Sequence, residues 1–154
     1  MEDIKTLNFK KMFIGEYKHN LDNKGRLAIP SKFRVSLKKG AVVTKGLDNC
    51  LFLYSKEEWK KEAKKFSNLP VSQSKARAIA RHTLAGAMEV SFDNQGRINL
   101  PSYLIKFANL KKKAVVAGLY DRLEIWDENI WEKYKEETDK ESGEIAETLG
   151  ELGI

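Results

Sequence analysis

The chain has 154 residues, with 28 Lys or Arg against 22 Asp or Glu and a formal net charge of +6. Its 42% of apolar residues exclude wholesale disorder, its single cysteine excludes an internal disulfide, and no apolar run approaches the roughly 18 to 20 residues of a membrane-spanning helix. The acidic N-terminus lacks the apolar core of a secretory signal, so we expect a cytoplasmic protein built as one domain.

The chain is expected to begin with a flexible extension at residues 1–11, and Met1 and Met12 are both candidates for the native start. Residues 16–58 then have the pattern of a β-turn-β-α-β-β unit. Its predicted elements are an alternating strand over 17–21, a turn over 22–25, a strand that ends at Pro30, a short helix capped by Ser31, and strands at 41–45 and 50–55.

A helical connector is predicted over residues 59–86. The Ser55-Lys-Glu-Glu58 capping box begins a first helix, which ends near Phe66 before Pro70. A second helix is expected to be capped by Ser74, to end at Gly86, and to carry an apolar stripe of Ala76, Ile79, Ala80 and Leu84.

Residues 87–130 repeat the first unit. The sequence Asp-Asn-Gln-Gly-Arg-Ile-Asn-Leu-Pro-Ser at 93–102 matches 22–31 at six of ten positions, with an offset of 71 and with Ser102 as the second helix cap. Because a unit of about 44 residues buries too little core to be stable alone, we expect the two copies to fuse about a pseudo-twofold axis into one α+β domain.

The C-terminal segment, residues 131–154, is acidic. Asp127 is the expected cap of a helix over 128–140, and residues 141–154 are expected to be solvated and partly disordered, although the spacing of Ile145, Leu149 and Leu152 also fits a weakly docked helix. Residues 127–154 carry a net charge of −7, whereas residues 1–126 carry +13. The basic part favours a polyanion partner, but a Lys-rich composition without any partner also explains it.

No catalytic constellation is visible, and we expect no enzyme activity, no cofactor and no metal site. His19 lies on the inward face of its strand, and His82 has no nucleophile at a suggestive spacing. Cys50 lacks the basic surroundings that lower a thiol pKa, so it is expected to be structural.

The repeated Asp-Asn-x-Gly-Arg turn is the clearest functional signal, because it places Arg26 and Arg97 directly after a tight turn. Arginine offers a planar fork that fits phosphate and the O6/N7 edge of guanine, and a two-stranded β-ribbon fits the major groove of B-DNA. We therefore predict that both arginines read bases while Asp22 and Asp93 orient them. A turn stabilised only by its own Arg–Asp ion pair is the alternative.

Side chains around the turns complete the predicted DNA site. Lys18, Lys24 and Arg34 flank the first turn in sequence and are expected to contact phosphates. Gln95 stands in the second turn where the first has Lys24, so the second turn is expected to be the weaker reader.

Three features together resemble the MraZ family over about residues 12–135: the doubled D-x-x-G-R turn followed by Pro-Ser, Met12-Phe-Ile-Gly-Glu16, and Arg81-His-Thr-Leu-Ala-Gly-Ala-Met-Glu-Val90. The resemblance implies a bacterial transcriptional regulator with two SpoVT-AbrB-like units in a double-split, swapped-hairpin barrel. It implies closed homo-oligomeric rings, nucleoid association, and binding to double-stranded DNA at short G-rich direct repeats in the promoter of its own division and cell-wall gene cluster. It also implies that Arg26 contacts DNA.

Two other classes of protein also fit the sequence, a protein-interaction module and an enzyme. We expect no membrane as a partner in any of these cases. A protein-interaction module, like antidote members of the AbrB-like superfamily, would need an extended acidic or aromatic tail. An enzyme acting on an acidic substrate would need an activity that survives the loss of DNA binding by both arginines. We expect no small-molecule substrate. Repression and activation both fit the sequence.

Overall fold

A computed structural model of the chain describes residues 12–154, so the flexible extension predicted at 1–11 lies outside the described residues. Its elements follow the same order in the two halves of the chain. The first half contains β1 (Phe13–Asn20), β2 (Arg26–Ala28), α2 (Ser31–Arg34), the 3-10 helix η1 (Val35–Leu37), β3 (Ala41–Lys45), β4 (Leu51–Ser55) and α3 (Lys56–Ser67). After α4 (Ser74–Ala80) and the π-helical turn η2 (Arg81–Ala85), the second half contains β5 (Met88–Val90), β6 (Arg97–Asn99), α5 (Ser102–Phe107), β7 (Lys113–Tyr120), β8 (Leu123–Asp127) and α6 (Glu128–Glu151).

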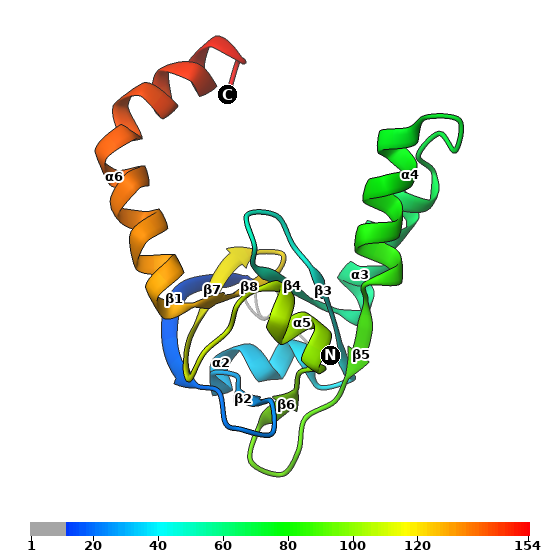
Figure 1. Cartoon of the computed structure of the whole chain (residues 1–154), viewed down its shortest axis with the longest axis vertical. Coiled ribbons are helices and arrows are strands. Elements are labelled where there is room, and N and C mark those ends of the chain that lie inside the picture. The colour runs from blue at the N-terminus through cyan, green and yellow to red at the C-terminus, as the bar shows by residue number, and fades with distance from the viewer. Residues whose placement is uncertain (1–11) are drawn as a thin grey trace, which may run out of the picture.

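The strands form a six-stranded antiparallel sheet, in the order β1-β7-β8-β4-β3-β5, and a separate two-stranded ribbon of β2 and β6 (Figure 1). The first strand of each half pairs with a strand of the other half: β1 pairs with β7, and β5 pairs with β3. The predicted α+β class is confirmed. The predicted barrel is not found, since β1 and β5 are open edges of the sheet and the described strands do not close.

The second strand of each half also differs from the expected hairpin. Apart from one bridge between Leu21 and Leu27, β2 does not pair with β1 but with β6. The turn that precedes β2 therefore connects the sheet to the ribbon, and the ribbon contains one strand from each half.

The pairing register reveals a pseudo-twofold axis. In the ribbon, Leu27 faces its repeat equivalent Ile98, and in the sheet Phe52 faces its equivalent Glu124. The pair Leu51–Ile125 becomes the pair Leu53–Leu123 when the two halves are exchanged. The axis passes between these self-equivalent pairs, as expected for two fused copies.

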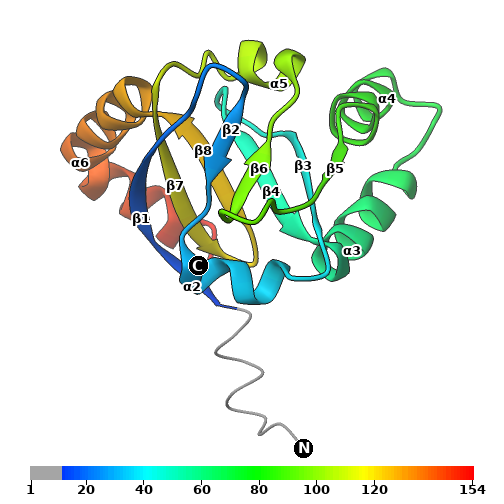
Figure 2. The ribbon, with the colours of Figure 1, turned by 90° about the horizontal axis from the view of Figure 1, so that it is seen from below.

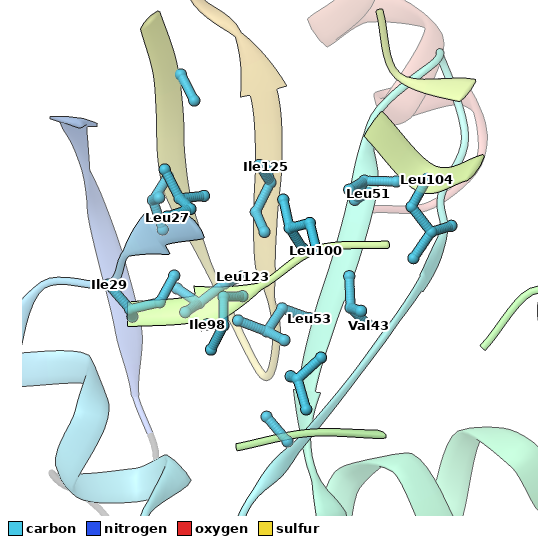
Figure 3. Close-up of a cluster of buried hydrophobic side chains, with 14 of the residues drawn as sticks. Leu27, Ile29, Val43, Leu51, Leu53, Ile98, Leu100, Leu104, Leu123 and Ile125 are labelled. Atoms are coloured by element: carbon cyan, nitrogen blue, oxygen red, sulfur yellow. The ribbon is translucent and has the colours of Figure 1, made fainter. Parts of the chain in front are cut away.

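The hydrophobic core lies between the sheet and the ribbon and draws on both halves (Figure 3). Leu27 and Ile98 of the ribbon are fully buried at 0% exposure, as are Leu53 and Leu123 of the sheet. Burying a side chain of this kind stabilises the fold by about 1.5–3 kcal/mol. Neither half has this core by itself, which explains why the copies occur in one chain.

The N-terminal caps of the helices show which of the predicted capping residues are correct. Ser55 Oγ accepts a hydrogen bond from Glu58 N at 3.2 Å, and the Asp127 carboxylate accepts one from Ile130 N at 3.3 Å, so both predicted caps are confirmed. The caps predicted at Ser31, Ser74 and Ser102 are wrong. These serines are the first helical residues, and the positions before them are Pro30, Gln73 and Pro101, none of which makes a side-chain cap bond. Both prolines already have the extended backbone that precedes a helix.

The C-terminal helix is longer than the sequence predicted. Its first turns cover the outer face of the sheet, where Ile130 and Trp131 pack on Cys50, Val115 and Trp126. The helix then continues to Glu151, so the partial disorder expected for residues 141–154 is wrong, and the alternative of a helix is found, although residues 141–154 are exposed and do not dock on the sheet. Beyond the sheet its apolar side chains stay exposed, with Ile145 and Leu149 at 40% and 41%. No helix of the described part of the chain is both long and apolar enough to cross a membrane.

Candidate nucleic-acid interface

The ribbon presents one polar face to solvent. Arg26 lies opposite Asn99, and Ala28 lies opposite Arg97. Since side chains alternate along a strand and Leu27 and Ile98 point into the core, these four residues face outward. Figure 2 shows β2 and β6 side by side in front of the sheet. The result is a short, two-stranded surface with an arginine on each strand.

The first turn holds its arginine through Asp22. Asp22 Oδ1 accepts hydrogen bonds from Lys24 N at 3.0 Å and Arg26 N at 2.8 Å, and Oδ2 accepts one from Arg26 Nε at 2.6 Å. Gly25 has φ +80°, and a Cβ there would lie 2.8 Å from the Leu100 carbonyl oxygen, so the position requires glycine. The sequence thus fixes both the turn and the direction of the Arg26 side chain.

The second turn has the same bonding pattern. Asp93 Oδ1 accepts from Gln95 N at 2.8 Å and Arg97 N at 3.0 Å, and Oδ2 accepts from Arg97 Nε at 2.9 Å. Gly96 has φ +75°. Arg97 Nη1 also lies 3.7 Å from Asp22 Oδ2, which links the two turns across the ribbon.

These bonds set the electrostatics of the turns. The backbone hydrogen bond from Arg26 is the largest cause of the lowered pKa of Asp22, and the Arg26 side chain and Lys24 amide lower it further. The pKa of Asp93 is lowered in the same way, with the Arg97 backbone bond first. Both carboxylates are therefore ionised at neutral pH. Each arginine bonds its own carboxylate through Nε, which leaves the Nη1–Nη2 edge of Arg26 in a position to meet a ligand. In Arg97 the Nη1 end of this edge also faces Asp22, at 3.7 Å from its Oδ2.

Two of the predicted phosphate contacts lie away from the first turn. Lys18 is on the outer face of β1, where its Nζ lies 3.4 Å from Glu128 and 3.8 Å from Glu132 of α6. Strand alternation explains this position, because Tyr17 and His19 take the inward face. Arg34 lies against Gly96 of the second turn, across the ribbon. Lys24 and Gln95 are exposed at the tips of their turns, as expected.

Sequence reasoning missed two groups beside the turns. Asn99 is exposed directly opposite Arg26, and only the strand pairing reveals it, since its repeat equivalent is Ala28. A hollow next to Asp22 and Gly25 is lined by Lys111, Lys112 and Lys113, which come from the other half of the chain. The pairing of β1 with β7 brings this lysine run to the first turn, and nothing local in the sequence indicates it.

The family model described as "MraZ protein, putative antitoxin-like" matches the chain twice, over residues 12–82 and 83–150, and each match contains one of the two turns. The chain belongs to the MraZ family. It is 46% identical over 143 residues to a protein named transcriptional regulator MraZ from Halothermothrix orenii, which covers 93% of this chain and 100% of the relative. Proteins of the same name from Caldanaerobacter subterraneus and Thermoanaerobacter sp. are 47% and 48% identical, with the same coverage. The resemblance to the MraZ family is confirmed.

The histidines and the cysteine of this MraZ-family chain have structural surroundings. His82 Nε2 lies 3.1 Å from the Gly46 carbonyl oxygen, and burial lowers the pKa of His19. The Cys50 thiol is buried, donates to the Leu47 carbonyl at 3.1 Å, and has its pKa raised by that burial and by Glu124. Among residues 12–154, no group of three or more His, Cys, Asp or Glu side chains could hold a metal ion.

Proposed function

We propose that this chain is a transcriptional regulator that binds double-stranded DNA sequence-specifically through the outer face of the β2–β6 ribbon. One observation carries the proposal. Two equivalent turns hold Arg26 and Arg97 by the same two hydrogen bonds to an aspartate, from the backbone N and from Nε, at the two ends of one short ribbon. The curated relatives are named transcriptional regulators, which supports the same interpretation.

Base readout follows from the chemistry of the ribbon. An antiparallel β-ribbon fits the major groove, where the Nη edge of an arginine can bond O6 and N7 of guanine. Two arginines on one ribbon favour G-rich sites, and the target that we propose is a series of short G-rich direct repeats in the promoter of the chain's own division and cell-wall gene cluster. Asn99, beside Arg26, has the amide that can pair with adenine.

Phosphate contacts would come from the lysines around the ribbon. Lys24 is exposed at the tip of the first turn, and Lys111, Lys112 and Lys113 line the adjacent hollow. Such contacts release counter-ions, so affinity should fall steeply with salt. Lys18 is left out of this surface because it faces α6.

We further propose that the regulator acts as a closed homo-oligomeric ring on the nucleoid. The helices α3 and α6 follow equivalent strands, and Figure 1 shows α6 and the α3–α4 pair extending from opposite sides of the sheet, away from the ribbon. The α3–α4 pair, residues 56–80, forms a basic arm with seven Lys or Arg and three Asp or Glu, whereas α6 forms an acidic arm with three Lys and nine Asp or Glu. Opposite charges on opposite sides favour head-to-tail contacts between copies, which close into rings. A ring would present many ribbons to repeated sites, which raises the effective affinity.

A binding titration tests the DNA proposal. The purified chain is titrated into labelled DNA from upstream of its own gene and into the same fragment with its G-rich repeats shuffled, at physiological salt. Specific binding predicts a difference of at least about 10³-fold in affinity. Equal affinity for the two fragments would leave only a general polyanion-binding protein, and no binding to either fragment would contradict the proposal.

A further inference from the structure

Arg34 occupies a special position under the second turn. A Cβ atom built on Gly96 would collide with the Arg34 guanidinium, so the glycine leaves the space that this group fills. At the equivalent position of the first turn, Gly25 faces Ile105, whose Cδ1 would be 3.1 Å from such a Cβ. Arg34 and Ile105 are repeat equivalents, so the two turns are backed by different chemistry.

The Arg34 guanidinium has no counter-ion in the described part of the chain. Its Nε is buried and has no hydrogen-bond partner, and the Arg34 side chain makes no hydrogen bond or ion pair within residues 12–154. Three other arginines differ, since Arg26, Arg97 and Arg122 each bond a carboxylate at 2.6 to 2.9 Å. Partial burial of a cation without an anion costs free energy. The position therefore fits an anion that comes from outside the chain.

The cationic side chain also occupies a different position in the two turns. The first turn has Lys24 at its tip and Ile105 behind it, whereas the second has Gln95 at its tip and Arg34 behind it. Counting only the tip and the position behind it, each turn thus has one cation in addition to its reader arginine, and the first turn also has Lys111 to Lys113 beside it. We infer that Arg34 forms a phosphodiester-binding subsite at the second turn and supplies the charge that Gln95 lacks. The inference rests on the proposed function, and it makes the second turn as competent as the first for DNA.

The test replaces Arg34 by the residue that backs the first turn. Arg34→Ile should leave the urea midpoint of the free protein unchanged or higher, because an unpaired cation is removed. It should at the same time weaken binding to the upstream DNA fragment. The slope of log K against log salt should become shallower by about 0.9 for each phosphate that the variant no longer neutralises. A purely structural arginine would give a lower midpoint and an unchanged slope, and this result would overturn the inference.

A rescue variant shows whether the effect of Arg34 on DNA binding comes from its positive charge or from its packing. Adding Gln95→Lys to Arg34→Ile gives the second turn the chemistry of the first, and the wild-type slope should return. Arg34→Lys should keep the slope, and Arg81→Ile, a matched loss of one exposed arginine outside the ribbon, should leave both slope and affinity unchanged. If Arg34→Ile fails to fold, the slope for Arg34→Gln decides in the same way. No rescue by Gln95→Lys would contradict the inference, whereas failure of the wild type to bind DNA would contradict the proposed function itself.

Discussion

Asp22 and Asp93 show how acidic residues can fit on a surface that we propose to meet phosphate. Each carboxylate accepts two backbone hydrogen bonds and one from its arginine, so its charge is directed into the turn. The same bonds favour the ionised form and lower both pKa values. The carboxylates therefore fix the arginines and repel DNA little.

A pH titration checks this role. Both pKa values are lowered in the folded chain, so the stabilisation that these carboxylates give is present above the ordinary pKa of an unfolded aspartate and is lost progressively as the pH falls through the lowered values. We expect carboxyl chemical shifts with titration midpoints below 3.8 for both residues and no effect of their titration on DNA binding between about pH 5 and 8. In Arg26→Ala the midpoint of Asp22 should move up while that of Asp93 stays. A midpoint at or above 3.8 in the wild type would contradict the bonding pattern.

The composition of the turns could be predicted from sequence because it is local. Asp, Gly and Arg act within five consecutive positions, and the repeat points to them twice. The surroundings of the turns depend on pairing between distant segments. Arg34 lies at the second turn and Asn99 lies beside Arg26 because β2 pairs with β6, and Lys111 to Lys113 lie at the first turn because β1 pairs with β7.

Among the elements, the ribbon depends on its two turn glycines. A side chain at Gly25 would meet the Leu100 carbonyl, and a positive φ disfavours any residue with a Cβ. Gly25→Ala should cost about 1–3 kcal/mol of unfolding free energy, measured by urea denaturation, and should weaken DNA binding.

Gly143 provides the control for this substitution. It lies inside α6, and a Cβ there would have no atom within 4 Å. Gly143→Ala should leave DNA binding unchanged, keep the urea midpoint the same or raise it slightly, and increase the helical signal slightly, since alanine favours helix over glycine by about 0.5–1 kcal/mol. Equal losses in the two variants would show that Gly25 has no special backbone role.

The helices show which features of an element can be predicted from neighbouring residues and which cannot. The caps at Ser55 and Asp127 could be predicted because their side chains bond an amide three residues later. The length of α6 could not, because its distal turns gain no burial on the sheet and their charge pattern resembles that of a solvated tail. The fused core could be predicted from the repeat, whereas the open sheet with exchanged edge strands required the three-dimensional pairing.

At the scale of the whole molecule, the proposed ring depends on contact between an acidic and a basic arm. Glu144→Lys with Glu147→Lys reverses charge on α6, and Lys60→Glu with Lys64→Glu reverses it on α3; all four side chains are exposed. Each pair alone should dissociate the oligomer in light-scattering measurements, while the four changes combined should restore it. A wild-type monomer at micromolar concentration, or an oligomer that none of these changes affects, would contradict the arm-to-arm contact.

We propose that this molecule reads DNA through arginines fixed on one ribbon, and footprinting of wild type and Arg26→Ala on DNA upstream of the gene is the most direct test. Arg81→Ala is the matched control, because it removes one exposed arginine from η2. We predict a regular series of protected G-rich repeats for wild type and control. For Arg26→Ala we predict a loss of about 5- to 150-fold in affinity per site, equivalent to about 1–3 kcal/mol, with weaker discrimination between bases. An unchanged footprint in Arg26→Ala at physiological salt would contradict the account.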